Sequence, residues 1–306
     1  MGTNYPTGIS SFGVPVLGSG LQVPVTTGNY YFVSSVTGSN GNDGKSPQNP
    51  FATVKYAITQ TTVSNGDCII MMPYHTESIA VAGGWTPLAG TSIVGLGWGG
   101  AKPVITLTAT TSTILCSAAN LLFQNFRTTT GISEVVTVFS VSAADVTINA
   151  VDHIETGTYT CISWLVTAAA GNRTSVLNCR HQTTTAPAGT AGWITFVGND
   201  ACNVINNTIT ITRPNNAAAY VVGGLTTAST NLVIQNNLLG SMATGTTLIA
   251  CSLYSGSTGL VSDNRGHNLG KTAIAGGFAL ASATGFNNLT THTANKCGLL
   301  DPVVDS

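Results

Sequence analysis

Short apolar segments that close with polar residues recur along the chain at a nearly constant interval. The last residues of six such segments lie 25, 29, 28, 30 and 27 positions apart. The segments are rich in Val, Ile and Leu and lack the apolar spacing of a helix. A period of this length built from β-type segments predicts a solenoid. The six segments are Leu121–Asn125, Val146–Ala150, Ser175–Cys179, Asn203–Asn207, Val233–Asn237 and Leu260–Asn264.

The content of each repeat selects one kind of solenoid. Each repeat offers two or three short Val, Ile, Leu and Thr runs separated by Gly, Asn, Ser and Ala-Ala turns. Ankyrin or TPR repeats would instead need two amphipathic helices each. We therefore predict an all-β fold, a right-handed parallel β-helix with one repeat per rung. The closing Asn residues fit, because Asn tolerates left-handed turns and stacked Asn side chains hydrogen-bond along the axis. A β-sandwich with irregular strands is the alternative interpretation.

The chain divides into an arm, a body and a tail. Residues 1–28 are rich in Gly, Pro, Ser and Thr with isolated apolar side chains, which predicts an extended arm that packs on a partner. A disordered tail is the alternative. We assign 29–285 to the parallel β-helix, with rungs from about residue 66. The rung pattern is lost after 285, so 286–306 is predicted to be a C-terminal cap or tail.

Residues 29–65 are predicted to form the N-terminal cap of the β-helix. A strand-like run and a Gly- and Asn-rich turn come first, followed by a mostly helical stripe after two prolines. A short helix here would plug the open end of the solenoid and block end-to-end strand pairing. The stripe consists of Phe51, Val54, Tyr56, Ala57 and Ile58.

The composition leaves few charges for the surface. Only 7% of the residues are charged, against a norm of about 25%, whereas 43% are hydrophobic and the mean hydropathy is +0.28. So few charges indicate that sister chains or another protein cover part of the surface. We expect a homo-oligomer, specifically a homotrimer.

Other function classes are disfavoured by charge and segment composition. The net charge is −1 and the Lys and Arg residues are scattered, so we expect no nucleic-acid binding. The N-terminus has no basic and apolar leader, and no apolar stretch is long enough to span a bilayer, so we expect neither Sec export nor membrane insertion. The seven cysteines form no CxxC pair and no cluster with a nearby His, which predicts buried thiols, no metal site and no cofactor.

Two sets of residues resemble known proteins. The first resembles the opening of pectin-lyase-like right-handed β-helix proteins, which implies that fold. The second is similar to a group of tailed-bacteriophage proteins, often encoded near capsid genes, with a short arm ahead of a pectin-lyase-like body. The resemblance covers residues 5 to about 105, and the rest of the chain only through the rung pattern. The first set is Phe32-Val33, Gly38, Asn42-Asp43-Gly44, Ser46-Pro47, Pro50-Phe51-Ala52-Thr53, Ala57-Ile58, Gly66-Asp67 and Ile69-Ile70; the second is Tyr5–Val16, Met72–Glu77 and Ile93–Gly97.

Catalysis would require clustered acids on one face of such a body. A glycoside hydrolase needs two carboxylates at about 5–9.5 Å, and a lyase needs acidic Ca²⁺ ligands with a basic proton acceptor. Only 11 Asp and Glu residues exist in the chain. The best cluster is Asp152, His153 and Glu155, with Arg180 and His181 one rung further on. These five residues form a candidate glycan site. An ion pair between rungs, with hydrogen bonds, would explain their proximity equally well.

Two other groups of residues have structural and functional interpretations. His75, Glu77 and Tyr74 resemble an acid–base group, but we expect them to form a capped loop that holds the first rung. Four tryptophans could stack on sugars, but their apolar surroundings favour the core or subunit contacts. They are Trp85, Trp98, Trp164 and Trp193.

From the phage resemblance and the sparse charge we predict a non-enzymatic structural protein of a phage virion, with no catalytic residue. It would decorate or stabilise the capsid, or form a head projection, on the exterior of the particle. Its partners would be its own copies in a homotrimer and the major capsid protein or another virion protein. The alternatives are a tailspike-type protein that binds or depolymerises a host-surface glycan, and a secreted polysaccharide lyase. The arm residues expected to contact the capsid are Tyr5, Ile9, Phe12, Val14, Val16 and Leu17.

Overall fold

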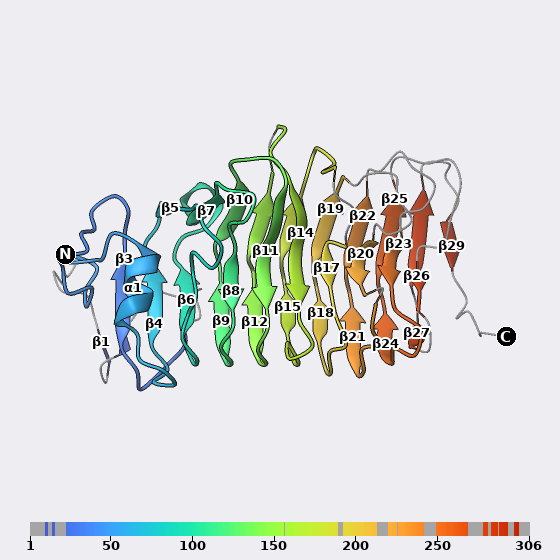
Figure 1. The fold of residues 1–306 in the computed structure, drawn as a ribbon, viewed down its shortest axis with the longest axis horizontal. Helices are drawn as coiled ribbons and strands as arrows, with labels where there is room; N and C mark the ends of the chain where they lie inside the picture. The colour runs from blue at the N-terminus through green and yellow to red at the C-terminus, as the bar shows by residue number, and fades with distance from the viewer. Residues whose placement is uncertain are drawn as a thin grey trace, which may run out of the picture.

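In a computed structural model, the chain forms a right-handed parallel β-helix, as the repeat pattern predicts. Three sheets run along its length, and successive rungs stack from the N-terminal to the C-terminal end (Figure 1). From β8 onward each repeating rung contributes a strand to each sheet, and the strand of one rung pairs in parallel with its counterpart in the next. The structure describes residues 10–11, 14–15, 23–155, 157–188, 192–212, 220–224, 226–241, 249–268, 278–280, 283–286, 288–292 and 297–299.

The predicted apolar segments supply the third of the three sheets. Their inward side chains form one continuous column, in which Phe123, Ile148 and Val176 occupy successive rungs and are fully buried. Alternate residues along each strand face the core, so a period-2 pattern buries one side chain in two. The strands of this third sheet are β3 (Tyr30–Val33), β4 (Cys68–Met71), β6 (Ser92–Gly95), β9 (Leu121–Gln124), β12 (Val146–Asn149), β15 (Ser175–Leu177), β18 (Asn203–Ile205), β21 (Leu232–Gln235), β24 (Gly259–Ser262) and β27 (Thr284–Phe286).

The first and second sheets complete each rung. The first sheet consists of β5 (Thr76–Ile79), β7 (Val104–Leu107), β10 (Arg127–Thr130), β13 (Asp152–Ile154), β16 (Arg180–Gln182), β19 (Thr208–Ile211), β22 (Leu238–Ser241), β25 (Arg265–Asn268), β28 (Leu289–His292) and β29 (Cys297–Leu299). The second consists of β8 (Ile114–Cys116), β11 (Val135–Val141), β14 (Cys161–Thr167), β17 (Ile194–Thr195), β20 (Tyr220–Gly223), β23 (Ile249–Ser252) and β26 (Phe278–Ala279).

A two-residue corner joins the third sheet to the first in the repeating rungs. Its first residue has a positive φ, and its second residue points inward. Asn and Asp tolerate this left-handed conformation better than other residues with a Cβ, which explains their frequency here. The prediction that the closing asparagines provide left-handed turns is confirmed. The first corner residues are Asn125, Ala150, Asn178, Asn206, Asn236 and Asp263.

The second corner residues of the later rungs form a buried asparagine ladder, which we define as Asn207, Asn237, Asn264 and Asn288. Asn207 Nδ2 donates to Asn237 Oδ1 at 2.9 Å, and Asn237 Nδ2 donates to Asn264 Oδ1 at 2.8 Å. Asn264 continues the ladder to Asn288 at 3.0 Å. Each side chain also bonds backbone groups, so all four amides are satisfied inside the core. The expected stacking of Asn along the axis is confirmed here.

The N-terminal cap contains the expected helix, α1 (Val54–Gln60). Thr53 Oγ1 accepts a hydrogen bond from the amide of Tyr56 at 3.1 Å and so caps the first turn. Val54, Ala57 and Ile58 are buried, and the helix packs on β3 and β4 at the N-terminal end (Figure 1). The cap also includes β3, which already pairs in parallel with β4. A one-turn 3₁₀ helix (Gly99–Ala101) is the other described helical segment.

At the far end, the parallel pairing continues beyond the sequence-based boundary. Residue 285 lies inside β27, and β28 still pairs in parallel with β25. The following strand, β29, pairs antiparallel with β28. The segment assigned to the C-terminal cap therefore holds one more rung strand and an antiparallel closing strand.

Most of the predicted arm lies outside the described residues. Two short strands, β1 (Ser10–Ser11) and β2 (Val14–Pro15), pair antiparallel within it. Tyr5, Ile9, Phe12, Val16 and Leu17 lie outside the described part, and the side chain of Val14 is not described either. Among the described residues, no helix has the length and apolar character needed to cross a membrane.

Candidate functional site

The five residues of the candidate glycan site do not form a surface patch. Their predicted adjacency in successive rungs is correct, because His153 and His181 are direct partners in β13 and β16. Strand alternation, however, turns His153 and His181 into the core, and Glu155 is buried with them. Three of the five side chains therefore cannot contact a glycan on the surface, and the glycan interpretation of this cluster is wrong.

The two remaining residues of that group face outward. Asp152 Oδ2 lies 3.0 Å from Lys102 Nζ, which also donates to the carbonyl of Ala150 at 2.8 Å. Arg180 is exposed on β16. An ion pair between rungs thus exists, but it joins Asp152 to Lys102, which lies two residues before β7 and two rungs earlier, and not to Arg180.

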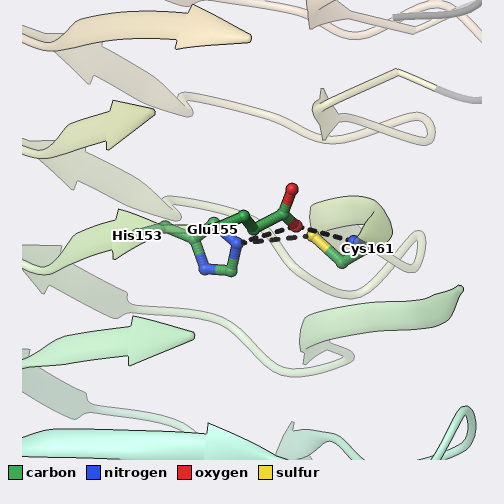
Figure 2. A group of neighbouring side chains, drawn as sticks. All are labelled: His153, Glu155 and Cys161. Carbon is green, nitrogen blue, oxygen red and sulfur yellow. Dashed lines mark hydrogen bonds and ion pairs between the residues drawn. The ribbon is translucent and has the colours of Figure 1, made fainter. Parts of the chain in front are cut away.

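The buried residues form a compact cluster at the corner between the first and second sheets. His153 Nε2 lies 3.1 Å from Glu155 Oε1 and 3.7 Å from Cys161 Sγ. The backbone amide of Cys161 donates to the same Glu155 oxygen at 2.6 Å. Figure 2 shows the three side chains converging across the corner. We call His153, Glu155 and Cys161 the corner cluster.

Threonine and tryptophan side chains enclose the corner cluster. Thr128 Oγ1, one rung earlier, lies 2.9 Å from His153 Nδ1 and accepts a hydrogen bond from Trp164 Nε1 at 3.3 Å. Trp193 Nε1 donates to His181 Nδ1 at 2.7 Å. All of these side chains are buried, so each polar contact is electrostatically strong.

The sequence prediction of no metal-ligand cluster missed this arrangement. His153 and Cys161 are eight residues apart and belong to different strands, which is not a common metal-binding spacing. Once the rungs are aligned, only a short loop separates the end of β13 from the start of β14. This short connection is the signal that could have placed Cys161 near His153. For five other cysteines, Cys68, Cys116, Cys179, Cys202 and Cys251, the predicted role as buried thiols is confirmed, and burial raises their pKa values.

His181 should make stability depend on pH. Burial lowers its pKa well below the ordinary 6.5, and the neighbouring His153 lowers it further. Below pH 6.5 the unfolded state therefore binds a proton that the folded state does not, and stability falls as the pH falls, by up to about 1.4 kcal/mol per pH unit. Urea unfolding between about pH 7.5 and about pH 5 should show this slope.

The matched variant for this prediction is His181→Gln. Its amide oxygen can still accept from Trp193 Nε1, but it has no titrating group. We expect a shallower decrease in the free energy of unfolding with falling pH in the variant. His153 also faces this position and is present in both proteins. Identical slopes would show that His181 does not titrate between the folded and unfolded states.

His75 and Glu77 have the structural role expected for them. The Glu77 carboxylate accepts the first two helix amides, Val54 N at 2.6 Å and Lys55 N at 3.1 Å, and Trp85 Nε1 at 3.0 Å. His75 Nδ1 accepts from Ser35 N at 2.9 Å, so His75 Nε2 carries the hydrogen that faces Glu77. This pair joins the cap to the first rung.

Every carboxylate in the described part of the chain has a structural partner. Nine of the 11 acidic residues lie there. On the surface, Arg173 donates two hydrogen bonds to Asp145 at 2.6 and 2.7 Å, which lower the pKa of Asp145. The partners of all nine are Lys45 for Asp43; Asn29, Thr62 and Asn65 for Asp67; the α1 amides for Glu77; Ala188 for Glu134; Arg173 for Asp145; Lys102 for Asp152; His153 and Cys161 for Glu155; Thr230 and Asn231 for Asp200; and Gln235 for Asp263.

The fold and its buried polar ladders define a protein of the parallel β-helix class. No protein-family model and no curated protein matches the sequence. Among solved structures, the chain is similar to a rhamnogalacturonan lyase, with a TM-score of 0.47, 12% identity and coverage of 90% of each chain. It is also similar to the GH136 lacto-N-biosidase from Eubacterium ramulus, with a TM-score of 0.46, 10% identity and coverage of 86% of this chain and 67% of that chain. These likenesses concern the path of the chain.

Proposed function

We propose that the chain is a non-enzymatic structural protein of a phage virion, which decorates the capsid or forms a projection on the head. The observation that carries this proposal is the use of the carboxylates. All nine described acidic side chains hold turns, helix amides or neighbouring rungs. Hydrolysis or elimination on a glycan recruits acidic side chains to the substrate or its metal ion, whereas these nine bond groups of the protein itself. A scaffold needs no such group.

The surface supports association with further protein. Trp98 is 87% exposed and Tyr74 is 65% exposed, and Tyr74 N donates to the carbonyl of Ala101, three residues after Trp98. Exposed aromatic side chains are typical of the centres of protein interfaces. The other three tryptophans lie in the core, so Trp98 is the one available to a subunit contact. Together with 7% charged residues, this favours side-by-side packing of copies in a homotrimer.

The arm at residues 1–28 would attach the trimer to the major capsid protein or to another virion protein on the outside of the particle. A parallel β-helix suits this location, because each rung closes its backbone hydrogen bonds against its neighbours and leaves few sites for proteases. Apolar arm residues would supply the contact, since a low-charge segment binds best by burying apolar surface. The arm residues involved are Tyr5, Ile9, Phe12, Val14, Val16 and Leu17.

The test is to find the chain in purified tailed-phage particles made by the host that carries its gene, and to locate its density by cryo-electron microscopy. Density on the capsid lattice or vertices, in groups of three, is expected. Light scattering of the purified full chain should give three times 31.2 kDa. Absence from the particles would overturn the proposal, and density at the tail tip would favour the tailspike alternative.

A particle-binding assay tests whether the arm attaches the protein to the particle, separately from whether the body folds. The full chain with Ile9→Ser, Phe12→Ser and Leu17→Ser should remain folded and trimeric. It should no longer bind phage particles from which the unchanged protein is absent. The control carries Val81→Ser and Val136→Ser, which change two exposed apolar residues of the body. The control should bind like the unchanged protein. Equal loss of binding in both proteins would argue against the arm as the attachment site.

A further inference from the structure

The corner cluster brings together donors from both sides of a corner of the β-helix. His153 lies in β13 of the first sheet, Glu155 follows that strand directly, and Cys161 begins β14 of the second sheet. The backbone between them turns from one sheet to the other. Figure 2 shows the imidazole, the carboxylate and the thiol pointing toward one another across this turn.

The distances among the three donor atoms suit a tetrahedral metal ion. His153 Nε2, Glu155 Oε1 and Cys161 Sγ all lie within 4.8 Å of one another, with 3.1 Å and 3.7 Å for the two contacts of Nε2. Zinc binds nitrogen and oxygen at about 2.0–2.2 Å and sulfur at about 2.3 Å, which separates tetrahedral ligands by about 3.3–3.6 Å. Shifts of a few tenths of an ångström in the two Nε2 contacts would therefore bring them to zinc-binding distances.

The hydrogen bonds around His153 allow the tautomer whose Nε2 carries no hydrogen and can bind a metal ion. When Thr128 Oγ1 donates its one hydrogen to the carbonyl of Asp152 at 3.2 Å, its contact with His153 Nδ1 at 2.9 Å uses the hydrogen on Nδ1. In the neutral imidazole, Nε2 is then an acceptor that faces a carboxylate oxygen at 3.1 Å. Two acceptors at this distance repel unless a cation or a proton lies between them.

The His75–Glu77 pair provides an internal comparison with the same sequence spacing. There the backbone amide of Ser35 donates to His75 Nδ1, so Nε2 carries the hydrogen and bonds Glu77 normally. No cysteine of the described chain takes part in that pair. The added thiol of Cys161 and the hydroxyl contact at Nδ1, in place of a backbone amide donor, distinguish the corner cluster from this purely structural pair.

We propose that His153, Glu155 and Cys161 bind one zinc ion, with a water molecule as the fourth ligand. Thiolate, imidazole and carboxylate together favour zinc over calcium or magnesium, which prefer oxygen ligands. Thr128 orients the imidazole through its other nitrogen, as is usual for metal-binding histidines. Burial prevents a substrate from reaching the ion, so the site is structural. The ion is taken up during folding and holds the corner between the first and second sheets.

Zinc content of the full-length protein tests the proposal. The chain is produced with zinc in the growth medium, passed through gel filtration without chelator, and analysed by plasma mass spectrometry. We expect about one zinc ion per chain. Cys161→Ser and His153→Gln should each reduce the bound zinc at least about tenfold, and Thr128→Val should weaken affinity about 10- to 100-fold. Cys116→Ser, which alters an equally buried cysteine outside the cluster, should keep the full zinc content.

Cobalt substitution gives a second measurement that does not depend on any variant folding. Protein produced with cobalt should show tetrahedral d–d bands and a near-ultraviolet charge-transfer band that only thiolate ligation produces. Two results together would overturn the proposal. The unchanged protein would contain no more zinc than Cys161→Ser, and it would show no charge-transfer band after growth or refolding in cobalt. The contact between His153 and Glu155 would then be an ordinary hydrogen bond that Nε2 donates to the carboxylate.

Discussion

Glu77→Gln should destabilise the N-terminal cap by about 3–5 kcal/mol, because one buried carboxylate satisfies four donors. Val54 N, Lys55 N, Trp85 Nε1 and His75 Nε2 all bond its two oxygens. Glutamine replaces one oxygen with an NH₂ group that faces donors. The cap should therefore unfold before the body, since solenoid rungs are stabilised mainly by their neighbours.

Hydrogen exchange of the amides in α1 measures this effect locally, and urea unfolding measures it globally. Amides of the first helical turn should exchange faster in Glu77→Gln, while those of β12 and β15 should change little. Asp43→Asn is the matched control, because the exposed Asp43 accepts one bond from Lys45 N and should change stability by less than about 0.5 kcal/mol. A loss below about 1 kcal/mol for Glu77→Gln would contradict the role assigned to this carboxylate.

Asn237→Leu should also cost about 3–5 kcal/mol, because it removes an interior member of the asparagine ladder. Asn237 Oδ1 accepts from the backbone and the side chain of Asn207. Its Nδ2 group donates to Val204 O and to Asn264 Oδ1. Leucine has a similar size but no polar atom, so these buried groups would lose their partners without a cavity to admit water.

Thermal and urea unfolding of Asn237→Leu should therefore show a lower midpoint. The comparison variant is Asn203→Ala, whose half-buried side chain donates one hydrogen bond, to Ser175 Oγ at 3.1 Å. Its loss should cost about 1 kcal/mol. Equal midpoints for the two variants would indicate that the ladder contributes no more than an ordinary surface hydrogen bond.

The fold could be predicted from the sequence because a parallel β-helix repeats a local rule. Phe123, Ile148 and Val176 hold one register position in three rungs, so the alternation within a segment and the interval between segments both report the same core. The left-handed corner residues are equally local, since Asn125 and Asn178 reflect the conformation of their own backbone. The end of the body was harder to place, because β27 and β28 carry too few apolar residues to continue the pattern visibly.

The corner cluster shows where sequence reasoning stopped. A period of 28 residues correctly placed His153 beside His181, but it did not specify which face of β13 each side chain occupies. A shift of one residue in a strand exchanges inside and outside, so the same five residues could have been a surface patch or a buried group. The meeting of Cys161 with His153 depends in addition on how the intervening loop turns, which no periodicity encodes.

The sequence by itself determined the solenoid, its repeat, its capping helix and its sparsely charged surface, because each follows from local spacing or composition. Only the tertiary structure decided that all nine described carboxylates serve as structural partners, and that the corner cluster lies inside. Those outcomes depend on which rung lies against which, as when Lys102 reaches Asp152 or Glu77 caps α1. Such contacts join residues distant in the chain, and their geometry arises only when the rungs stack.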